Sequence, residues 1–238
     1  MSTEVTFRND ITVKLVKHNV KDSDVAMAAR VSTIGGSHEE EVDLTKDEGL
    51  INYLMRDRHG SPFEHGSFTF YVEAPIFVAR EHFRHRAGWS YNEESGRYKT
   101  LKPSFYVPGK ERNLVQVGKP GAYTFEPGTS FQKGLVPYVM QGTYEAIYGE
   151  YEAMLLHGIA KEVARMILPV GLMTSYYATC NPRSLMHFLS LRTINDESAY
   201  PSFPQKEIEM VADEMEEVFA DAMPLTWSAF MRHGRVSP

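Results

Sequence analysis

The sequence predicts a helix-rich α+β protein that forms a single domain with few strands. Its 238 residues, of which 42% are hydrophobic and 24% charged, have the length and composition of one soluble domain. Several long segments carry apolar residues at the period of a helix, whereas only two segments have the composition of strands. We therefore expect a chain that is rich in helix and has few strands.

Two helices are predicted near the N-terminus. The segment 22–32 has an apolar side and begins with Asp22 or Ser23, either of which is a favourable N-cap residue. Over 45–60 apolar residues again recur at helical spacing, and Gly60 can end that helix.

A strand and a third helix are predicted next, followed by a loop. Apolar and polar residues alternate over 67–75, which is typical of a half-buried strand. Pro75 suits the first turn of a helix, and we expect that helix to run on to Arg86. Residues 102–130 are rich in proline and glycine, which predicts a long surface loop.

The C-terminal half is predicted to be mainly helical. Periodicity indicates a long helix over 131–157, a helix over 181–192 and an acidic amphipathic helix over 207–223. Between the first two of these, residues 172–180 have the composition of a strand. The acidic residues of the last helix are most simply a solvated face.

Composition limits the classes of function. The net charge of -6 gives no long-range positive field for nucleic acid, so an anion site would have to be local. Neither a secretory signal nor a long apolar run of a membrane span is present, which favours a cytoplasmic protein. Cys180 is the only cysteine, so a disulfide within the chain and a cysteine-based zinc site are excluded, and we interpret it as a buried, inert thiol.

A local anion site is suggested by the polar stretch FRHRAGWSYNEESGRY at 83–98. Arg80 and Arg84 would lie one turn apart on a helix face and form a fork for a phosphate or carboxylate. A solvated basic helix end explains that spacing equally well. The residues that follow favour the ligand, because Gly96 allows backbone N–H groups to face an anion.

Histidines in the same region are weaker candidates. His82 and His85 could bind zinc together with Glu81, but the surrounding arginines oppose a cation, so no metal site is predicted. His59 and His65 flank SPFE, and such histidines are more often structural than catalytic.

Two arginines further along the chain lie among apolar residues. Arg165 and Arg192 would either extend their charged ends to water or pair with a buried anion. Few acidic residues are near them in sequence, which suggests that the anion is a ligand. The sequence contains no G-x-G-x-x-G after a strand, no P-loop and no G-x-S-x-G, so the residues alone do not name a reaction.

The motif RHRAGWSYNEESGRY resembles the signature of the flavin-dependent thymidylate synthases, an RHR triplet followed by Ser and then Arg. Further blocks resemble that family in the same order along the chain: AARVS at 28–32, SPFEH at 61–65, APIFVAR at 74–80, EVAR at 162–165 and NPRSLMHFLSLR at 181–192. The resemblance therefore covers most of the chain, from about residue 25 to about residue 195.

This resemblance implies a reaction, a fold and an assembly. The family converts dUMP to dTMP, with the carbon from methylenetetrahydrofolate and the reducing equivalents from NADPH through bound FAD. We expect its helix-rich α+β fold with a small, mostly antiparallel sheet. We also expect a homotetramer with shared active sites, and no nucleic-acid or membrane partner.

The resemblance also implies site residues. The catalytic residues would be Arg192, Ser95 and His59. The dUMP site would be formed by Glu81, Arg84, Glu93, Glu94, Ser95, Gly96, Arg97, Arg165 and Arg192. The FAD site would be formed by Ser32, His59, Ser61, Glu64, Arg84, His85, Arg86, Glu93, Asn181, Arg183 and His187.

Roles can be assigned to some of these residues. Arg97 and Arg165 are candidates for the phosphate, and Arg192 could stabilise negative charge on the uracil ring. Ser95 is better interpreted as a binding residue than as a nucleophile, because no base is adjacent in sequence. Glu81 stands where some family members have Gln, and it would need an arginine such as Arg84 as its partner.

Two rival interpretations follow from the same residues. A nucleic-acid-binding module would use the arginines and aromatic residues of 83–98, but the acidic net charge opposes it. A family member that binds flavin or dUMP without catalysis is the second rival. The presence of Arg84, Ser95, Arg97 and Arg192 disfavours it.

Overall fold

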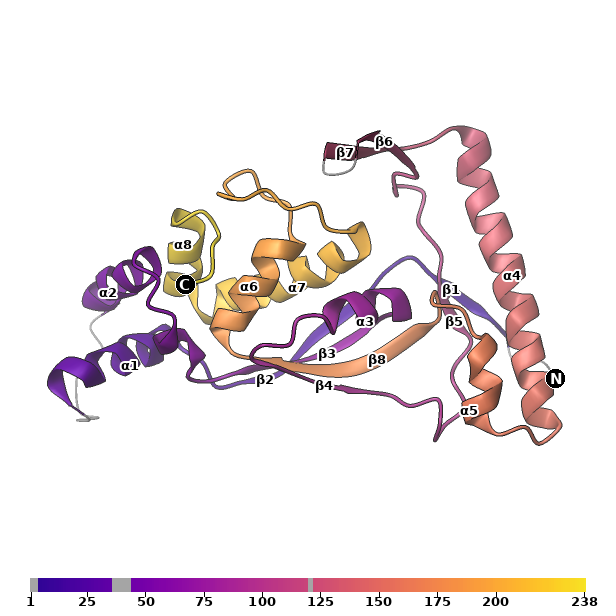
Figure 1. Cartoon of the computed structure of the whole chain (residues 1–238), viewed down its shortest axis with the longest axis horizontal. Helices are drawn as coiled ribbons and strands as arrows, with labels where there is room; N and C mark the ends of the chain where they lie inside the picture. The colour runs from indigo at the N-terminus through magenta and orange to yellow at the C-terminus, as the bar shows by residue number, and fades with distance from the viewer. Residues whose placement is uncertain (1–3, 36–43, 120–121) are drawn as a thin grey trace. The chain divides into compact units, whose positions relative to one another are not determined.

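The computed structural model of the chain describes residues 4–35, 44–119 and 122–238 (Figure 1). The chain divides into two compact units. Unit 1 comprises Met1–Asp10, Ala74–Ala79 and Glu94–Thr174, and unit 2 comprises Ile11–Glu73, Arg80–Glu93 and Ser175–Pro238. The single domain expected over 1–238 stays a prediction.

A four-stranded sheet forms most of the β structure. Its order is β2-β3-β8-β4, with bounds Thr12–His18, Phe68–Pro75, Met173–Cys180 and Trp89–Glu93. β2 pairs with β3, and β4 pairs with β8, in both cases antiparallel. The small, mostly antiparallel sheet is therefore confirmed, as are the two strands predicted from the sequence. β2 and β4 were not predicted, because short strands with mixed polarity give a weak signal.

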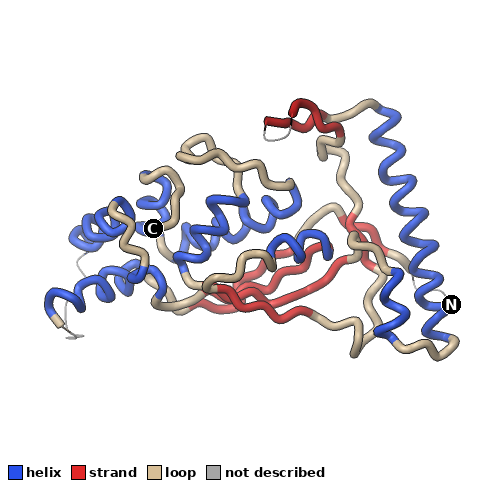
Figure 2. Tube along the Cα trace, viewed as in Figure 1, coloured by secondary structure: helices blue, strands red, loops and turns tan. Residues whose placement is uncertain are grey.

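One face of this sheet packs against helices of unit 2 (Figure 2). Phe68, Phe70 and Val72 on β3 are buried at alternate positions, as their spacing predicted. Phe68 meets Phe219 edge to face, with ring centroids 6.2 Å apart. Phe219 lies on α7, Lys206–Ala222, which packs against α6, Pro182–Arg192, and both confirm predicted helices. The apolar surface that they bury is the main source of stability in this unit.

The N-terminal helices of unit 2 form a second layer with the last helix. α1 spans Asp22–Ile34, α2 spans Leu44–Arg56 and α8 spans Pro224–Arg232. The N-cap of α1 is Lys21, so the prediction of Asp22 or Ser23 is wrong. The Asp22 carboxylate instead accepts hydrogen bonds from the backbone N–H groups of Leu225 and Thr226, at 2.9 and 2.8 Å. It therefore caps α8, which is distant in sequence.

The long helix of unit 1, α4, spans Ser130–Leu156 and confirms the helix predicted over 131–157. A capping box formed by Thr129 and Gln132 fixes its start. Its buried side carries Tyr144, Tyr148 and Tyr151, which pack around Phe105 in the core of this unit. The Tyr148 hydroxyl donates to the Leu101 carbonyl at 2.9 Å, so a buried polar group is satisfied.

The segment 102–130 differs from the surface loop that was predicted. In its described residues, 102–119 and 122–130, it contains β5, Ser104–Tyr106, and the hairpin of β6, Val115–Lys119, with β7, Ala122–Glu126. β5 pairs in parallel with β1, Thr6–Arg8, and Phe105 is fully buried. The prediction of a loop is therefore wrong over these strands, because glycine and proline residues mark turns without excluding the strands between them.

The helix predicted from Pro75 to Arg86 is shorter than expected. α3 spans Ile76–His82, and a turn leads from it to β4. Arg84 therefore lies outside the helix, and the fork of Arg80 and Arg84 on one helical face is not formed. After α4 come α5, Lys161–Ala164, and a short 3₁₀ helix, η2, over Arg165–Ile167.

His82 lies at the centre of an aromatic cluster in unit 2. Its ring is completely buried, 4.6 Å from that of Phe188 and 4.9 Å from that of Trp89. Its Nδ1 shares a 2.9 Å hydrogen bond with the hydroxyl of Tyr176. Burial is the main reason that the pKa of His82 falls to about 3, so the folded protein holds this histidine neutral.

Arg235 is a second buried polar anchor. Its guanidinium is hydrogen-bonded to both carboxylate oxygens of Glu216, at 2.5 and 2.6 Å, and donates to Thr193 Oγ1 at 2.6 Å. These bonds join the C-terminal residues to α7 and to the residue that follows α6.

No helix within the described ranges combines the length and apolar character that crossing a membrane requires.

We predict that Arg235→Met lowers the free energy of unfolding by about 3 kcal/mol, because it leaves the partners of a buried ion pair uncompensated. The matched control is Arg232→Met. Arg232 is half exposed, and its Nη2 lies 3.5 Å from Glu48 Oε1, so its loss should cost less than about 1 kcal/mol. Urea unfolding of both variants measures the difference, and equal losses would contradict the assigned role of Arg235.

A pH dependence follows from His82. The unfolded chain binds a proton at this residue near pH 6.5, whereas the folded chain does so only near pH 3. The free energy of unfolding should therefore fall as pH decreases through this interval, by about 1.4 kcal/mol per pH unit from this group.

His82→Gln retains a polar partner for Tyr176 but does not titrate, so its urea midpoint should depend less steeply on pH than that of the wild type. His157→Gln, an exposed replacement at the end of α4, is the control. An unchanged slope in His82→Gln would rule out this histidine as the source.

Candidate active site

Arg192, the last residue of α6, is the centre of the polar cluster in unit 2. Its Nε donates a hydrogen bond to His85 Nε2 at 3.1 Å, and its Nη1 donates to Glu81 Oε1. The anion that pairs with Arg192 is therefore a carboxylate of the chain itself, which corrects the expectation that only a ligand would fill this role. It also corrects the partner expected for Glu81, which is Arg192 rather than Arg80 or Arg84.

The contact with Arg192 determines the protonation of His85. Because Nε2 accepts a hydrogen bond from a guanidinium, the neutral ring carries its proton on Nδ1. Burial, and next the charge of Arg192, lower the pKa of His85 to about 4. His85 is therefore a neutral acceptor at physiological pH and adds no charge to the site.

Tyr91 fixes the turn that carries His85. Its hydroxyl lies 3.0 Å from the carbonyl oxygens of His82 and of His85, at the end of α3 and in the turn after it. Burial raises the pKa of Tyr91, so its hydroxyl remains a donor. This role of Tyr91 was not predicted from the sequence. The sequence signal that could have indicated it is that Trp89, Tyr91 and Glu93 occupy alternate positions of β4.

Three more predicted FAD residues lie near this cluster in sequence, and all are exposed. The guanidiniums of Arg84 and Arg86 have no hydrogen-bond or ion-pair partner among the residues that the structure describes. His187 lies on α6 with its ring 6.2 Å from that of His85. Two unpaired guanidiniums beside the neutral His85 fit the pyrophosphate and ring of a dinucleotide such as FAD.

A second group of predicted FAD residues gathers around Arg183. Its Nη1 donates to Glu64 Oε1 at 2.5 Å, and Glu64 ends the short 3₁₀ helix η1, Ser61–Glu64. The guanidinium lies against Gly60, where a Cβ atom would come within 2.5 Å of it. A larger residue at position 60 would therefore displace this guanidinium from its place beside Ser61.

The remaining predicted FAD residues are positioned separately. His59 is exposed and stacks on Tyr53, with ring centroids 5.5 Å apart. Asn181 is the N-cap of α6, since its side chain accepts from Ser184 N at 2.8 Å. Ser32 is exposed on α1, and its hydroxyl donates to the Ala29 carbonyl. Glu93 ends β4. Every residue predicted for FAD thus belongs to unit 2.

The predicted dUMP residues divide between the units. Glu81, Arg84, Glu93 and Arg192 belong to unit 2, whereas Glu94, Ser95, Gly96, Arg97 and Arg165 belong to unit 1.

Unit 1 brings several of its predicted residues together. A Cβ atom at Gly96 would lie 3.1 Å from Arg165 Cδ, so the Ser95–Arg97 segment lies directly beside Arg165. Arg165 is exposed rather than embedded among apolar residues, which corrects the interpretation made from its sequence neighbours. Its guanidinium has no partner among the described residues and is available to an anion.

The charges around this segment are only partly balanced. Arg97 Nε lies 3.0 Å from Glu162 Oε2, with both side chains half exposed. Glu94 pairs with Lys99 at 2.5 Å. Ser95 Oγ accepts a hydrogen bond from Arg97 N at 3.3 Å, and no basic side chain among the described residues is hydrogen-bonded to it. This fits binding by Ser95 rather than nucleophilic attack.

Cys180 has no catalytic setting. It is buried at the end of β8, and burial raises the pKa of its thiol well above the ordinary value. Since it is the only cysteine of the chain, a thiolate nucleophile is excluded. A covalent route through a cysteine thiolate is therefore closed to this protein.

Comparison with known proteins identifies relatives over nearly the whole chain. The sequence model described as thymidylate synthase complementing protein matches residues 14–225. A flavin-dependent thymidylate synthase of Streptomyces avermitilis is 60% identical over 235 residues, which cover 98% of this chain and 96% of that protein. One from Tropheryma whipplei is 55% identical, with 98% and 97% covered.

A solved structure also matches. The UMP/dUMP methylase PolB from Streptomyces cacaoi, bound with 5-Br dUMP, is 51% identical and superposes with a TM-score of 0.93, covering 98% of this chain and 100% of that one. The motif between Arg84 and Arg97, the α+β fold and these matches agree. The chain belongs to the family of flavin-dependent thymidylate synthases.

Proposed function

We propose that this protein catalyses the reductive methylation of dUMP to dTMP, with methylenetetrahydrofolate as carbon donor, NADPH as reductant and FAD as cofactor. The methylene carbon and one hydride become the methyl group, the C5 hydrogen of uracil leaves as a proton, and tetrahydrofolate and NADP⁺ are released. The observation that carries the proposal is the incompletely paired guanidinium of Arg192, held between Glu81 and His85.

Arg192 is suited to stabilise charge on the pyrimidine. Two of its nitrogens are engaged by Glu81 and His85, while Nη2 has no partner within the described residues. A fixed donor of this kind can face the oxygen on which negative charge develops as uracil C5 becomes nucleophilic. Because Arg192 cannot lose its proton, the interaction is available at every working pH.

The nucleotide phosphate is assigned to unit 1. Arg165 is an unpaired cation beside Gly96, and Arg97 lies next to the hydroxyl of Ser95. A phosphate would compete with Glu162 for Arg97, because a bidentate arginine–phosphate contact is stronger than a half-exposed ion pair. Glu94 and Glu93 remain assigned to dUMP from the motif alone.

FAD is assigned to a set of unit 2 residues whose side chains can donate or accept hydrogen bonds: Ser32, His59, Ser61, Glu64, Arg84, His85, Arg86, Glu93, Asn181, Arg183 and His187. When bound, FAD supplies two-electron hydride chemistry between NADPH and the pyrimidine. The arginines would neutralise its pyrophosphate, and the neutral His85 would donate through Nδ1. His59, stacked on Tyr53, offers an exposed ring at the edge of this site.

The proposed assembly is a cytoplasmic homotetramer with shared active sites. Its support lies on α4, where Phe131, Leu135, Tyr138 and Val139 are between 42% and 79% exposed. At about 100° per residue these side chains share one side of the helix, opposite the buried Tyr144, Tyr148 and Tyr151. A second copy of the chain would bury this row of apolar side chains. The relative from Streptomyces avermitilis spans nearly the same length as this chain.

The direct test is an anaerobic assay of the purified protein with FAD, NADPH, methylenetetrahydrofolate and dUMP. We expect stoichiometric formation of dTMP and tetrahydrofolate, measured by mass spectrometry.

UMP is a second candidate substrate, because PolB is described as a UMP/dUMP methylase. Comparing kcat/KM for UMP and dUMP decides between them. Absence of methylated product from either nucleotide would overturn the proposal.

We predict that Arg192→Ala lowers turnover by about 10²- to 10³-fold, because it removes a donor that acts as charge develops. Flavin absorbance and the affinity for dUMP should change far less than turnover. The control is Arg232→Ala, which removes a half-exposed arginine of α8 whose Nη2 lies 3.5 Å from Glu48 Oε1. Near-normal turnover of Arg192→Ala, with dTMP still formed, would refute its role.

A further inference from the structure

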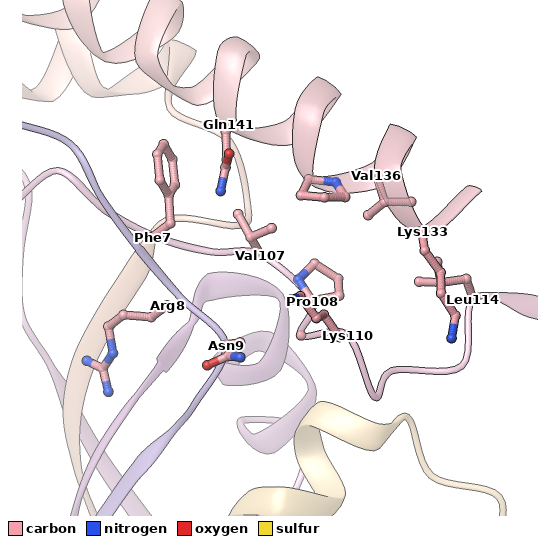
Figure 3. A pocket seen from close by; sticks show the side chains of 12 residues that line it. Phe7, Arg8, Asn9, Val107, Pro108, Lys110, Leu114, Lys133, Val136 and Gln141 are labelled. Carbon is pink, nitrogen blue, oxygen red and sulfur yellow. The ribbon is translucent and has the colours of Figure 1, made fainter. Parts of the chain in front are cut away.

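A pocket in unit 1 belongs to none of the assigned sites. It lies between the end of β1, the segment 107–114 and the N-terminal half of α4, and has a volume of about 320 Å³ (Figure 3). That volume is at the lower end of small-molecule sites. None of the residues predicted for dUMP or FAD lines it.

The lining is positively charged at one part and apolar at another. Lys110 and Lys133 contribute ammonium groups, and neither has an ion-pair or hydrogen-bond partner among the described residues. Arg8 is already paired with Asp10 at 2.9 Å, and its guanidinium points away from the centre of the pocket in Figure 3. No acidic side chain lines the pocket, so the two lysines give it a net positive charge.

The apolar lining is formed mainly by Phe7, Val107 and Leu114. Lys133 and Leu114 lie at one end, and Phe7 lies at the other (Figure 3). A ligand that spans the pocket would therefore meet a cation at one end and an aromatic ring at the other.

We propose that this pocket binds a small organic anion, with its carboxylate or phosphate held by Lys110 and Lys133 and its apolar body on Phe7, Val107 and Leu114. The amides of Asn9 and Gln141, which also line the pocket, can orient the polar part. Two ammonium groups without a carboxylate partner are the feature that specifies an anion. The pocket would be a site separate from that of dUMP.

Isothermal titration calorimetry with phenyl phosphate tests the proposal. The full-length protein is first saturated with FAD and dUMP, so that the phosphate-binding groups assigned above are occupied. Phenyl phosphate should then bind at one saturable site, and more tightly than inorganic phosphate or phenol, because each of those lacks one half of the complementary chemistry. Saturable binding of benzoate as well would identify the charge, rather than the phosphate group, as the recognised feature.

The double variant Lys110→Gln/Lys133→Gln should weaken this binding by about 10-fold or more, since charge-assisted hydrogen bonds are lost. Lys119→Gln, an exposed lysine on β6, is the matched control and should bind as the wild type does. The affinity for dUMP and the urea midpoint should be unchanged in both variants, which separates this site from the proposed reaction. No saturable binding by the wild type, or equal binding by the double variant, would show that the lysines are merely solvated and would overturn the proposal.

Discussion

The permanent charge of Arg192 is the constraint on which the arrangement of unit 2 around the site depends. A partly buried guanidinium must be compensated, because it cannot neutralise itself by losing a proton. Glu81 on α3 supplies the opposite charge, and His85 in the following turn supplies a neutral acceptor. The end of α6 is thereby tied to α3, and the same charge helps to keep His85 neutral.

The layer beneath this cluster keeps these groups in position. Tyr91 bonds to two carbonyl groups of the turn, and His82 bonds to Tyr176 within the aromatic core. Burying a neutral histidine makes the fold sensitive to acid, and His82 Nε2 has no hydrogen-bond partner in the part of the chain that the structure describes. A well-packed apolar side chain would avoid that cost. We infer that His82 is favoured because its bond to Tyr176 fixes the orientation of the chain just before His85.

The sequence predicted the helices and strands whose periodicity is long, but not the partners of their charged residues. α4, α6 and α7 were found because their apolar residues repeat over many positions, whereas β8 was found from its strand-like composition. The setting of Arg165 was misjudged from its apolar neighbours, since exposure depends on residues that are adjacent in space. The capping of α8 by Asp22 was missed for the same reason, because the two are about two hundred residues apart.

α4 carries more apolar surface than the core of unit 1 buries. Tyr144, Tyr148 and Tyr151 face the core of unit 1, while Phe131 and Tyr138 project from the opposite side and are 75% and 79% exposed. A helix that is apolar on two opposite sides is stable in water only if both sides are covered. The core of unit 1 covers one side of α4, so covering the other side requires a contact outside the unit. In a symmetric oligomer, α4 of a second copy would present the same apolar side chains to this side. The proposed oligomer would therefore complete the burial that folding of this unit begins.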